Sequence, residues 1–273
     1  MTANTLLAPA KTAVGSLAEQ LLAGVTGRHL AHVTATEAGL LAGMGFVDVL
    51  SAPAPAGTWR VLVKDGESVV AGQVLIEVEG TASELAVAED YVLGPLGFAS
   101  GIATRARIFR EACPEGLRMA CGGWKKLPAA LKPLLRAGLS AAGVLPRLVE
   151  GDFIYVNKNA VRLLGTVTDA IAAGRALGHG PVAVQVRSVE EGLLSARAGA
   201  GIIMVDTARL QDLSDVHQSL SAAGLRAQVV LAFGGGVRLE DLGPAHAAGA
   251  QAVDVGRAIL EAPLLDLRME VVA

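Results

Sequence analysis

Two glycine-rich stretches near the end of the chain have the residue types that bind anions. Residues 228–237 and 252–258 each begin with a short apolar run and stop at glycine. A parallel strand that stops at glycine can turn tightly or bring its backbone close to a ligand. Two adjacent strand ends of this kind, each followed by a helix, offer N–H groups and a positive helix N-terminus, which suit a phosphate. The alternative is that the glycines only form a turn. The predicted phosphate-binding residues are Gly234, Gly235, Gly236, Gly256 and Arg257.

Asp206 is a second candidate for chemistry, because it directly follows the apolar residues 201–205. A carboxylate at this point can cap the helix that follows. It can also accept hydrogen bonds from ribose hydroxyls or hold a divalent cation beside a phosphate. Its predicted position opposite the glycine loops favours the second interpretation.

The elements that must position these residues alternate from about residue 116 onward. Short apolar strands at 153–156, 182–186 and 201–206 are followed by helical patterns at 167–176, 189–198 and 213–222. This alternation predicts a parallel α/β barrel with its active site at the carboxyl ends of the strands. The polar residues expected at that rim are Asn157, Lys158, Asn159, Gln185, Arg187 and Asp206.

The N-terminal part has a different pattern. Residues 16–23 fit an amphipathic helix, residues 31–45 a strand and turn, and residues 83–110 one or two helices. Residues 59–80 alternate apolar and polar, with turn signals at 65–66 and 71–72, which predicts a small antiparallel unit of consecutive strands. No catalytic group stands out in this part.

Composition excludes several classes of function. The chain has 273 residues, 52% of them hydrophobic, which is enough to fill a sizeable core. Its mean hydropathy is +0.49, but no apolar run approaches the roughly 18 residues needed to span a bilayer. The net charge is −3 and aromatic residues make up 3%, which argues against nucleic acid as a partner. The N-terminus does not have the pattern of a secretory signal.

The cysteines and histidines give no metal signal. Cys113 and Cys121 lack metal-ligand spacing, and the five histidines are scattered. Two free thiols favour a reducing compartment, so we expect a cytoplasmic protein.

Seven segments in order make the chain resemble the quinolinate phosphoribosyltransferases, a group that includes molybdenum-transport-associated pyrophosphorylase relatives. The likeness runs from about residue 35 to the C-terminus. It implies an N-terminal α/β sandwich domain (1–103, joined by a last strand at 264–273), a partly open α/β barrel (104–263) and a homodimer or higher homo-oligomer. The segments are residues 37–43, 63–75, 100–104, 201–206, 234–236, 255–258 and 262–266.

The predicted active site departs from the family where the family binds a pyridine dicarboxylate. Family arginines correspond to Asp90 and Trp124, and a family lysine corresponds to Asn157. These changes leave the site short of about four positive charges, and each ion pair withdrawn from a desolvated pocket costs several kcal/mol. Quinolinate is therefore not the expected substrate.

Other positions of the family's site keep the family residue or change to a residue that still can bind substrate. Lys125 and Arg147 match a lysine and an arginine of the family, and Lys158 lies one place from a lost lysine. An acidic residue that touches ribose in the family corresponds to Gln185. Trp124 and Phe233 offer flat faces for a neutral or singly charged ring, with core packing as the alternative.

The resemblance implies a phosphoribosyltransferase or pyrophosphorylase that uses phosphoribosyl pyrophosphate with magnesium, with Asp206 in indirect contact with the metal. Its small-molecule acceptor is expected to be a nitrogen heterocycle other than quinolinate. The alternatives are a quinolinate enzyme with a clamp rebuilt from other cations, and a non-catalytic barrel that binds a phosphorylated metabolite. The expected catalytic residues are Asp206, Gln185 and Lys125, and the expected substrate-binding residues are Arg147, Trp124, Asn157, Lys158, Asn159 and Phe233.

Overall fold

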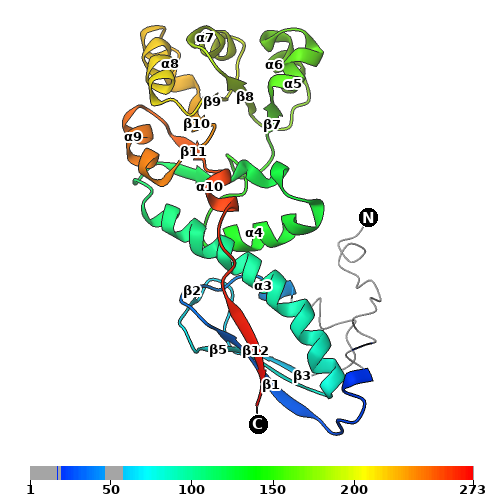
Figure 1. The fold of residues 1–273 in the computed structure, drawn as a ribbon. Coiled ribbons are helices and arrows are strands. Elements are labelled where there is room, and N and C mark those ends of the chain that lie inside the picture. Colours follow the sequence, from blue (N-terminus) through cyan, green and yellow to red (C-terminus); the bar gives the residue numbers. More distant parts are fainter. Residues whose placement is uncertain (1–16, 18–19, 47–57, 273) are drawn as a thin grey trace. The chain divides into compact units, whose positions relative to one another are not determined.

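The structure is a computed structural model that describes residue 17 and residues 20–46 and 58–272. Of the helix predicted at residues 16–23, residues 16, 18 and 19 lie outside the described residues, and residues 20 and 21 are helical. The chain forms two compact units (Figure 1). The sandwich unit comprises Met1–Ile108, Lys125–Gly143 and Ala262–Ala273, and the barrel unit comprises Phe109–Trp124 and Val144–Glu261.

The sandwich unit contains a four-stranded antiparallel sheet in the order β12-β1-β5-β3. The last strand of the chain pairs with the first, with Val33 opposite Met269. The C-terminal segment therefore completes the N-terminal sheet, as the family resemblance implies. The strands are β1 (His29–Ala35), β3 (Thr58–Val61), β5 (Val74–Gly80) and β12 (Leu267–Val271).

The predicted antiparallel unit at residues 59–80 has the expected turns but a different pairing. Gly66 and Gly72 have φ values of +87° and +84°, which glycine adopts without a steric cost. The middle strand, β4 (Ser68–Val69), pairs with β2 (Gly39–Leu40), whereas β3 pairs directly with β5. The expectation of consecutive paired strands was wrong, because the partner of β4 lies far back in the sequence.

Helix α3 (Ala82–Glu111) covers the sheet of the sandwich unit and continues through Pro95. Its apolar residues Leu85, Val92 and Leu96 share one core with residues of β1 and β5. The same unit contains α4 (Lys132–Ala141) and the short helix η3 (Ala129–Leu131). A single helix therefore accounts for the helical pattern at 83–110.

The barrel unit is built on a six-stranded parallel sheet in the order β6-β11-β10-β9-β8-β7. The predicted strand at 182–186 and the predicted helix at 167–176 are confirmed. The strands are β6 (Arg118–Ala120), β7 (Ile154–Val156), β8 (Val182–Val186), β9 (Ile202–Asp206), β10 (Val230–Gly234) and β11 (Ala252–Asp254).

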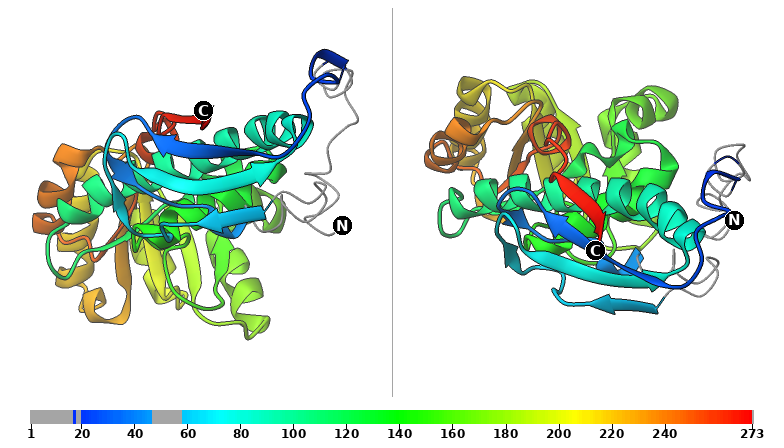
Figure 2. Two further views of the ribbon diagram at one scale, coloured as in Figure 1. Left: turned by 90° about the horizontal axis from the view of Figure 1, so that it is seen from below. Right: turned by 60° about the horizontal axis from the view of Figure 1, so that its bottom comes forward.

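Helices follow most of these strands and lie along the outer side of the sheet (Figure 2). Their buried faces are small or aliphatic, as in Ile171 and Gly174 of α6. A Cβ added at Gly174 would lie 3.1 Å from Val182, so glycine lets this helix approach the sheet closely. The helices are α5 (Lys158–Leu164), α6 (Val167–Ala176), α7 (Val189–Arg197), α8 (Leu210–Ala222), α9 (Leu242–Ala247) and α10 (Arg257–Leu260), with the short helices η2 (Gly122–Lys126), η4 (Arg226–Gln228) and η5 (Leu239–Asp241).

The inner side of the sheet is filled by a separate core cluster. Residues Ala120, Ala183 and Ala232 come from three different strands and are buried together with Ile202 and Met204. The sheet ends at β6 and β7, which pair with other strands but not with each other. An α/β barrel that is open between these two strands is therefore confirmed.

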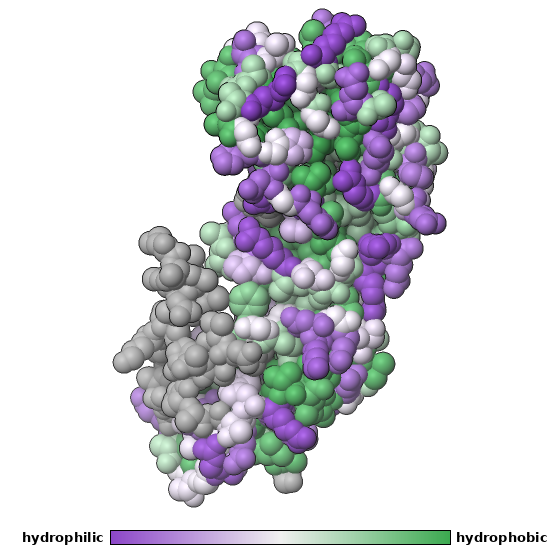
Figure 3. Space-filling model, turned by 180° about the vertical axis from the view of Figure 1, so that it is seen from behind, coloured by the Kyte–Doolittle hydropathy of each residue, from purple (hydrophilic) through white to green (hydrophobic). Residues whose placement is uncertain are grey.

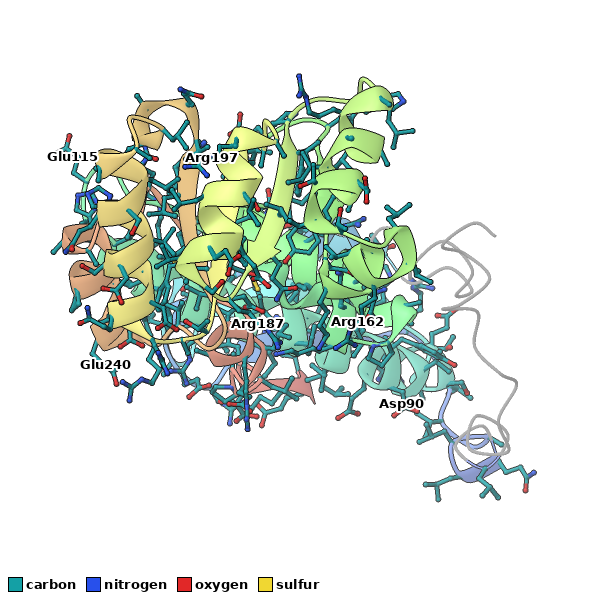
Figure 4. The ribbon with its side chains drawn as sticks, turned by 90° about the horizontal axis from the view of Figure 1, so that it is seen from above. Asp90, Glu115, Arg162, Arg187, Arg197 and Glu240 are labelled. Carbon is teal, nitrogen blue, oxygen red and sulfur yellow. The ribbon has the colours of Figure 1, made fainter. Side chains whose placement is uncertain are left out.

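Figure 4 labels residues at both ends of the parallel strands in the barrel unit. Glu115 precedes β6, and Arg197 ends α7 shortly before β9, so both lie at the amino ends of strands. Arg187 follows β8 and Glu240 follows β10. The carboxyl ends of the parallel strands thus share one rim, where the candidate site was predicted.

Candidate active site

Gly234 separates two carboxylates at the rim of the barrel unit. Strands β9, β10 and β11 are neighbours, and Gly234 pairs in register with Asp206. A Cβ added at Gly234 would lie 3.4 Å from Oδ1 of Asp206 and 3.6 Å from Cβ of Asp254. The sulfur of Met204 would be nearer still, at 3.0 Å, so glycine lets the end of β10 fit closely among these three side chains.

Gln185 and Asp206 form a polar pair across neighbouring strands. The side-chain amide of Gln185 donates a hydrogen bond to Oδ2 of Asp206, and both residues are half-buried. The amide thereby neutralises part of the cost of placing a carboxylate among apolar strands. The two residues, which the family resemblance places together at a ribose, are in direct contact in the structure.

Tyr155 of β7 faces the same inner core and was not predicted as a site residue. Burial, followed by the negative charges of Asp206 and Asp254, raises the pKa of its hydroxyl from 10.0 to about 12. Its ring meets Phe153 edge-on, with ring centroids 6.5 Å apart. The phenol is therefore protonated at neutral pH and is a hydrogen-bond donor near the two carboxylates.

Asp254 was also missed, although it lies inside one of the glycine-rich stretches. Its Oδ1 accepts a hydrogen bond of 2.6 Å from the backbone N–H of Gly122. Like Asp206, it is the last residue of a parallel strand. That shared position was the signal that could have identified it.

The loop after β10 has the backbone geometry that requires glycine. Gly235 and Gly236 have φ values of +98° and +128°. A Cβ added at Gly235 would lie 2.8 Å from the backbone nitrogen of Ala208 and 3.0 Å from the carbonyl carbon of Asp206. The N–H of Ala208 in turn donates to the carbonyl of Gly234. The glycine loop therefore packs directly on the residues that follow β9.

Gly256 precedes the single turn of α10 and packs on a second glycine segment. A Cβ added at Gly123 would lie 3.2 Å from Cα of Gly256. Arg257 is exposed and forms an ion pair with Glu261, which raises the pKa of its guanidinium. The rim therefore brings Gly234–Gly236 and Gly256 to the ends of adjacent strands, as predicted.

Asn157 is the N-cap of α5. Its side-chain oxygen accepts hydrogen bonds from the N–H groups of Asn159 and Ala160, at 2.8 and 3.0 Å. This local role explains the residue type. Lys158 and Asn159 are exposed in the first turn of the helix. Substrate contacts by these three residues stay a prediction.

Phe233 does not offer a face to a ligand. Its side chain is 1% exposed, and its register partners Val205 and Val253 are fully buried. Successive side chains of a strand point to opposite faces, and Ala232 belongs to the inner core. Phe233 therefore lies on the outer side of the sheet. The stacking role predicted for it was wrong, and its alternative, core packing, is correct.

The predicted cationic residues are less closely tied to the rim. Arg147 is exposed in the segment between β6 and β7. Lys125 is exposed and belongs to the sandwich unit, so its place at the site stays a prediction. The side chain of Trp124 lies outside the described part of the chain. Within that part, no group of three or more His, Cys, Asp or Glu residues could hold a metal ion.

The chain combines an open α/β barrel, with a polar pair and two glycine loops at its rim, and an antiparallel sheet that includes the last strand, and its family model and relatives are those of enzymes of the pentosyltransferase type. The chain belongs to the quinolinate phosphoribosyl transferase family: the C-terminal domain of that family matches residues 102–270 and the N-terminal domain matches residues 22–100.

Individual relatives are distant but cover most of the chain. The nicotinate-nucleotide pyrophosphorylase [carboxylating] of Rattus norvegicus is 28% identical over 240 residues, which is 86% of this chain and 79% of that protein. A probable nicotinate-nucleotide pyrophosphorylase [carboxylating] of Methanothermobacter thermautotrophicus is 24% identical over 257 residues, covering 89% of this chain and 88% of the other.

Solved structures support the fold. The nicotinate-nucleotide pyrophosphorylase from Francisella tularensis matches 99% of this chain and 96% of its own, with a TM-score of 0.81 and 19% identity. The surface in Figure 3 mixes hydrophilic and hydrophobic residues. Among the described residues, no helix is both long and apolar enough to span a membrane.

Proposed function

We propose that the protein transfers a 5-phosphoribosyl group between pyrophosphate and a nitrogen heterocycle that is not quinolinate. The observation that carries the first half of this proposal is the Gln185–Asp206 hydrogen bond beside the Gly234–Gly236 loop. A carboxylate and an amide oxygen suit the hydroxyls of a ribose, and the glycine backbone suits its 5-phosphate.

The second half rests on charge. A dicarboxylate that leaves water needs paired cationic donors. The family resemblance assigns three of those cation positions to Asp90, Trp124 and Asn157. Asp90 is an exposed acid on α3, and the side-chain oxygen of Asn157 caps α5. These residues do not supply the missing charge, which supports an acceptor with fewer negative groups than quinolinate.

The residues at the rim fit a magnesium ion that arrives with the substrate. Magnesium is usually held by one or two carboxylates together with substrate phosphates and waters. Asp206 and Asp254 are the two carboxylates on either side of Gly234. When bound, the metal would neutralise charge that develops on the pyrophosphate.

The chain's own residues would then orient the sugar. In the reaction, the bond between the anomeric carbon and pyrophosphate breaks with its electron pair leaving on pyrophosphate, and the ring nitrogen supplies the pair for the new bond. Asp206 and Gln185 would hold the ribose hydroxyls, and Gly235, Gly236 and Gly256 the 5-phosphate. Lys125 and Arg147 are proposed to face the pyrophosphate, because positive charge close to this leaving group stabilises the negative charge that develops on it.

A genuine quinolinate enzyme is the second candidate, and the printed names of the relatives favour it, since they describe carboxylating nicotinate-nucleotide pyrophosphorylases. In that case other cations, such as Arg105, Arg107 or Lys158, would rebuild the clamp. The N–H of Arg107 donates to the hydroxyl of Ser68 at 2.6 Å, so Arg107 already has a partner. Release of carbon dioxide from carboxyl-labelled quinolinate would decide for this candidate.

A homodimer and a cytoplasmic location are also part of the proposal. The family resemblance implies a dimer with active sites between subunits, and the two cysteines without ligand spacing favour a reducing compartment. Light scattering coupled to size-exclusion chromatography would show a particle of twice the chain mass if the dimer forms.

A thermal-shift screen tests the proposed acceptor. The protein is mixed with magnesium, phosphoribosyl pyrophosphate and one ring from a panel of mono-carboxylated, amide-bearing and neutral nitrogen heterocycles. Binding to the native state raises the melting temperature by mass action. We expect one of these rings to raise it further than quinolinate does. A higher melting temperature with quinolinate and with no other ring would contradict the proposed acceptor. It would still agree with the transfer of a phosphoribosyl group.

A further inference from the structure

Asp254 is linked by contacts to two of the three glycine segments that meet at the rim. It lies beside Gly234 and accepts a hydrogen bond from Gly122. The third segment, at Gly256, follows two residues later in the chain. The proposed share of Asp254 in holding magnesium does not account for its hydrogen bond to Gly122.

The hydrogen bond to Gly122 ends the pairing between β6 and β11. The N–H of Val255 donates to the carbonyl of Ala120 at 2.8 Å, which is the last backbone bond between the two strands. The next backbone donor on the β6 side that turns toward β11 is Gly122, and it meets the side chain of Asp254 instead of a carbonyl. The carboxylate of Asp254 thus takes the place of a backbone carbonyl as the hydrogen-bond acceptor, at the point where the chain leaves β6 and enters η2.

Gly122 has no room for a side chain while Asp254 is present. A Cβ added there would lie 2.5 and 2.9 Å from the two carboxylate oxygens. The residue after it, Gly123, has its backbone against Gly256 and against Leu260 of α10. The carboxylate and the two glycines therefore fit together as one arrangement.

We propose that Asp254 is a positioning residue: by holding the N–H of Gly122, it fixes the backbone of Gly122 and Gly123 against Gly256 and so shapes the rim that binds the 5-phosphate. This inference rests on the proposed function, because the phosphate is the ligand whose site is shaped. Asp254 acts on the ligand through the backbone and not by contact with it.

Calorimetric titration with ribose 5-phosphate tests the role through two substitutions of the same residue. Asp254→Ala removes the acceptor, and we expect the dissociation constant to rise about tenfold. Asp254→Asn keeps an oxygen that can accept from Gly122 but loses the charge, and we expect a value within about threefold of the wild type. Asp215→Asn is the matched control, since Asp215 is a helix carboxylate of α8 that accepts from Gln211, and it should bind as the wild type does.

Two results would overturn the inference. Asp254→Ala that binds ribose 5-phosphate as tightly as the wild type would show that the rim does not need the hydrogen bond. Asp254→Asn that loses as much affinity as Asp254→Ala would show that the charge itself contacts the ligand. A wild type that does not bind ribose 5-phosphate would instead contradict the proposed function.

A second measurement needs no ligand and covers the case in which Asp254→Ala folds poorly. Gly122→Ala forces a methyl group against the carboxylate, so urea unfolding should show a clear loss of stability. In the Asp254→Asn background the clash remains, whereas in the Asp254→Ser background the shorter side chain makes room and the loss should shrink. Equal losses in all backgrounds would contradict the contact on which the inference is built.

Discussion

The amide of Gln185 donates to the carboxylate of Asp206 across the β8–β9 pair, at the end of the sheet where the glycine loops lie. A carboxylate at position 185, which the family resemblance gives to related enzymes, would set two negative charges against each other. The neutral amide removes this repulsion and supplies a donor. The pair is thus a local reason for the residue type at 185.

Gln185→Glu is expected to make stability depend on pH. Two adjacent carboxylates share a proton, so the folded state of the variant would have a carboxyl pKa above the ordinary value of about 4. A raised folded-state pKa means that stability is kept at low pH and lost as the pH rises through that pKa. Urea unfolding should show a deficit of about 1–3 kcal/mol at pH 8 that shrinks at pH 5. Gln185→Met, which only loses the hydrogen bond, should show a deficit that is independent of pH.

Gly235→Ala and Gly224→Ala form a matched pair for the loop after β10. Both glycines have positive φ, at +98° and +69°, but a Cβ at Gly235 would meet the backbone of residues 206–208, whereas a Cβ at Gly224 meets nothing within 4 Å. Gly224→Ala should cost about 1 kcal/mol of unfolding free energy from backbone strain alone. Gly235→Ala should cost about 3 kcal/mol, because steric overlap adds to the strain. Equal costs would contradict the packing of the loop on the end of β9.

Ionisation of the Tyr155 hydroxyl should lower the stability of the protein at alkaline pH. Its pKa is about 12 in the folded protein and 10.0 ordinarily. Because the folded-state pKa is raised, the stabilisation is complete below pH 10 and is lost as the pH rises toward 12, by about 2 kcal/mol. The phenolate absorbance of the wild type minus that of Tyr155→Phe isolates this group from Tyr91, the other tyrosine. A difference curve centred near pH 10 would contradict the buried, acid-flanked setting of Tyr155.

Phe233→Leu should weaken the fold without changing ligand binding. The ring fills the outer side of the sheet and is 1% exposed, so the smaller side chain should cost about 1.5 kcal/mol. Chemical denaturation measures the cost, and the dissociation constant for ribose 5-phosphate should stay within about twofold of the wild type. A selective loss of ring binding, with stability unchanged, would restore the stacking role for Phe233.

The alternation of strands and helices could be predicted from the sequence because each element of the barrel unit carries its own signal. The run at 182–186 and the helical pattern at 167–176 match β8 and α6. The pairing of β4 with β2 could not be predicted, since it depends on partners distant in the sequence.

The candidate site was predicted in part for similar reasons. Asp206 and Gln185 follow apolar runs and could be placed at one rim. The side of the sheet on which Phe233 lies depends on the register with β9 and β11, which no local pattern fixes. The role of Asp254 depends on Gly122, which lies far earlier in the sequence.

Calorimetric titration with phosphoribosyl pyrophosphate and magnesium tests the central claim, that this rim binds a phosphoribosyl group, most directly. The wild type and Gly224→Ala are expected to bind one equivalent per chain, and Gly235→Ala to show at least a tenfold weaker affinity. Absence of binding by the wild type, or equal affinity for all three proteins, would contradict the claim.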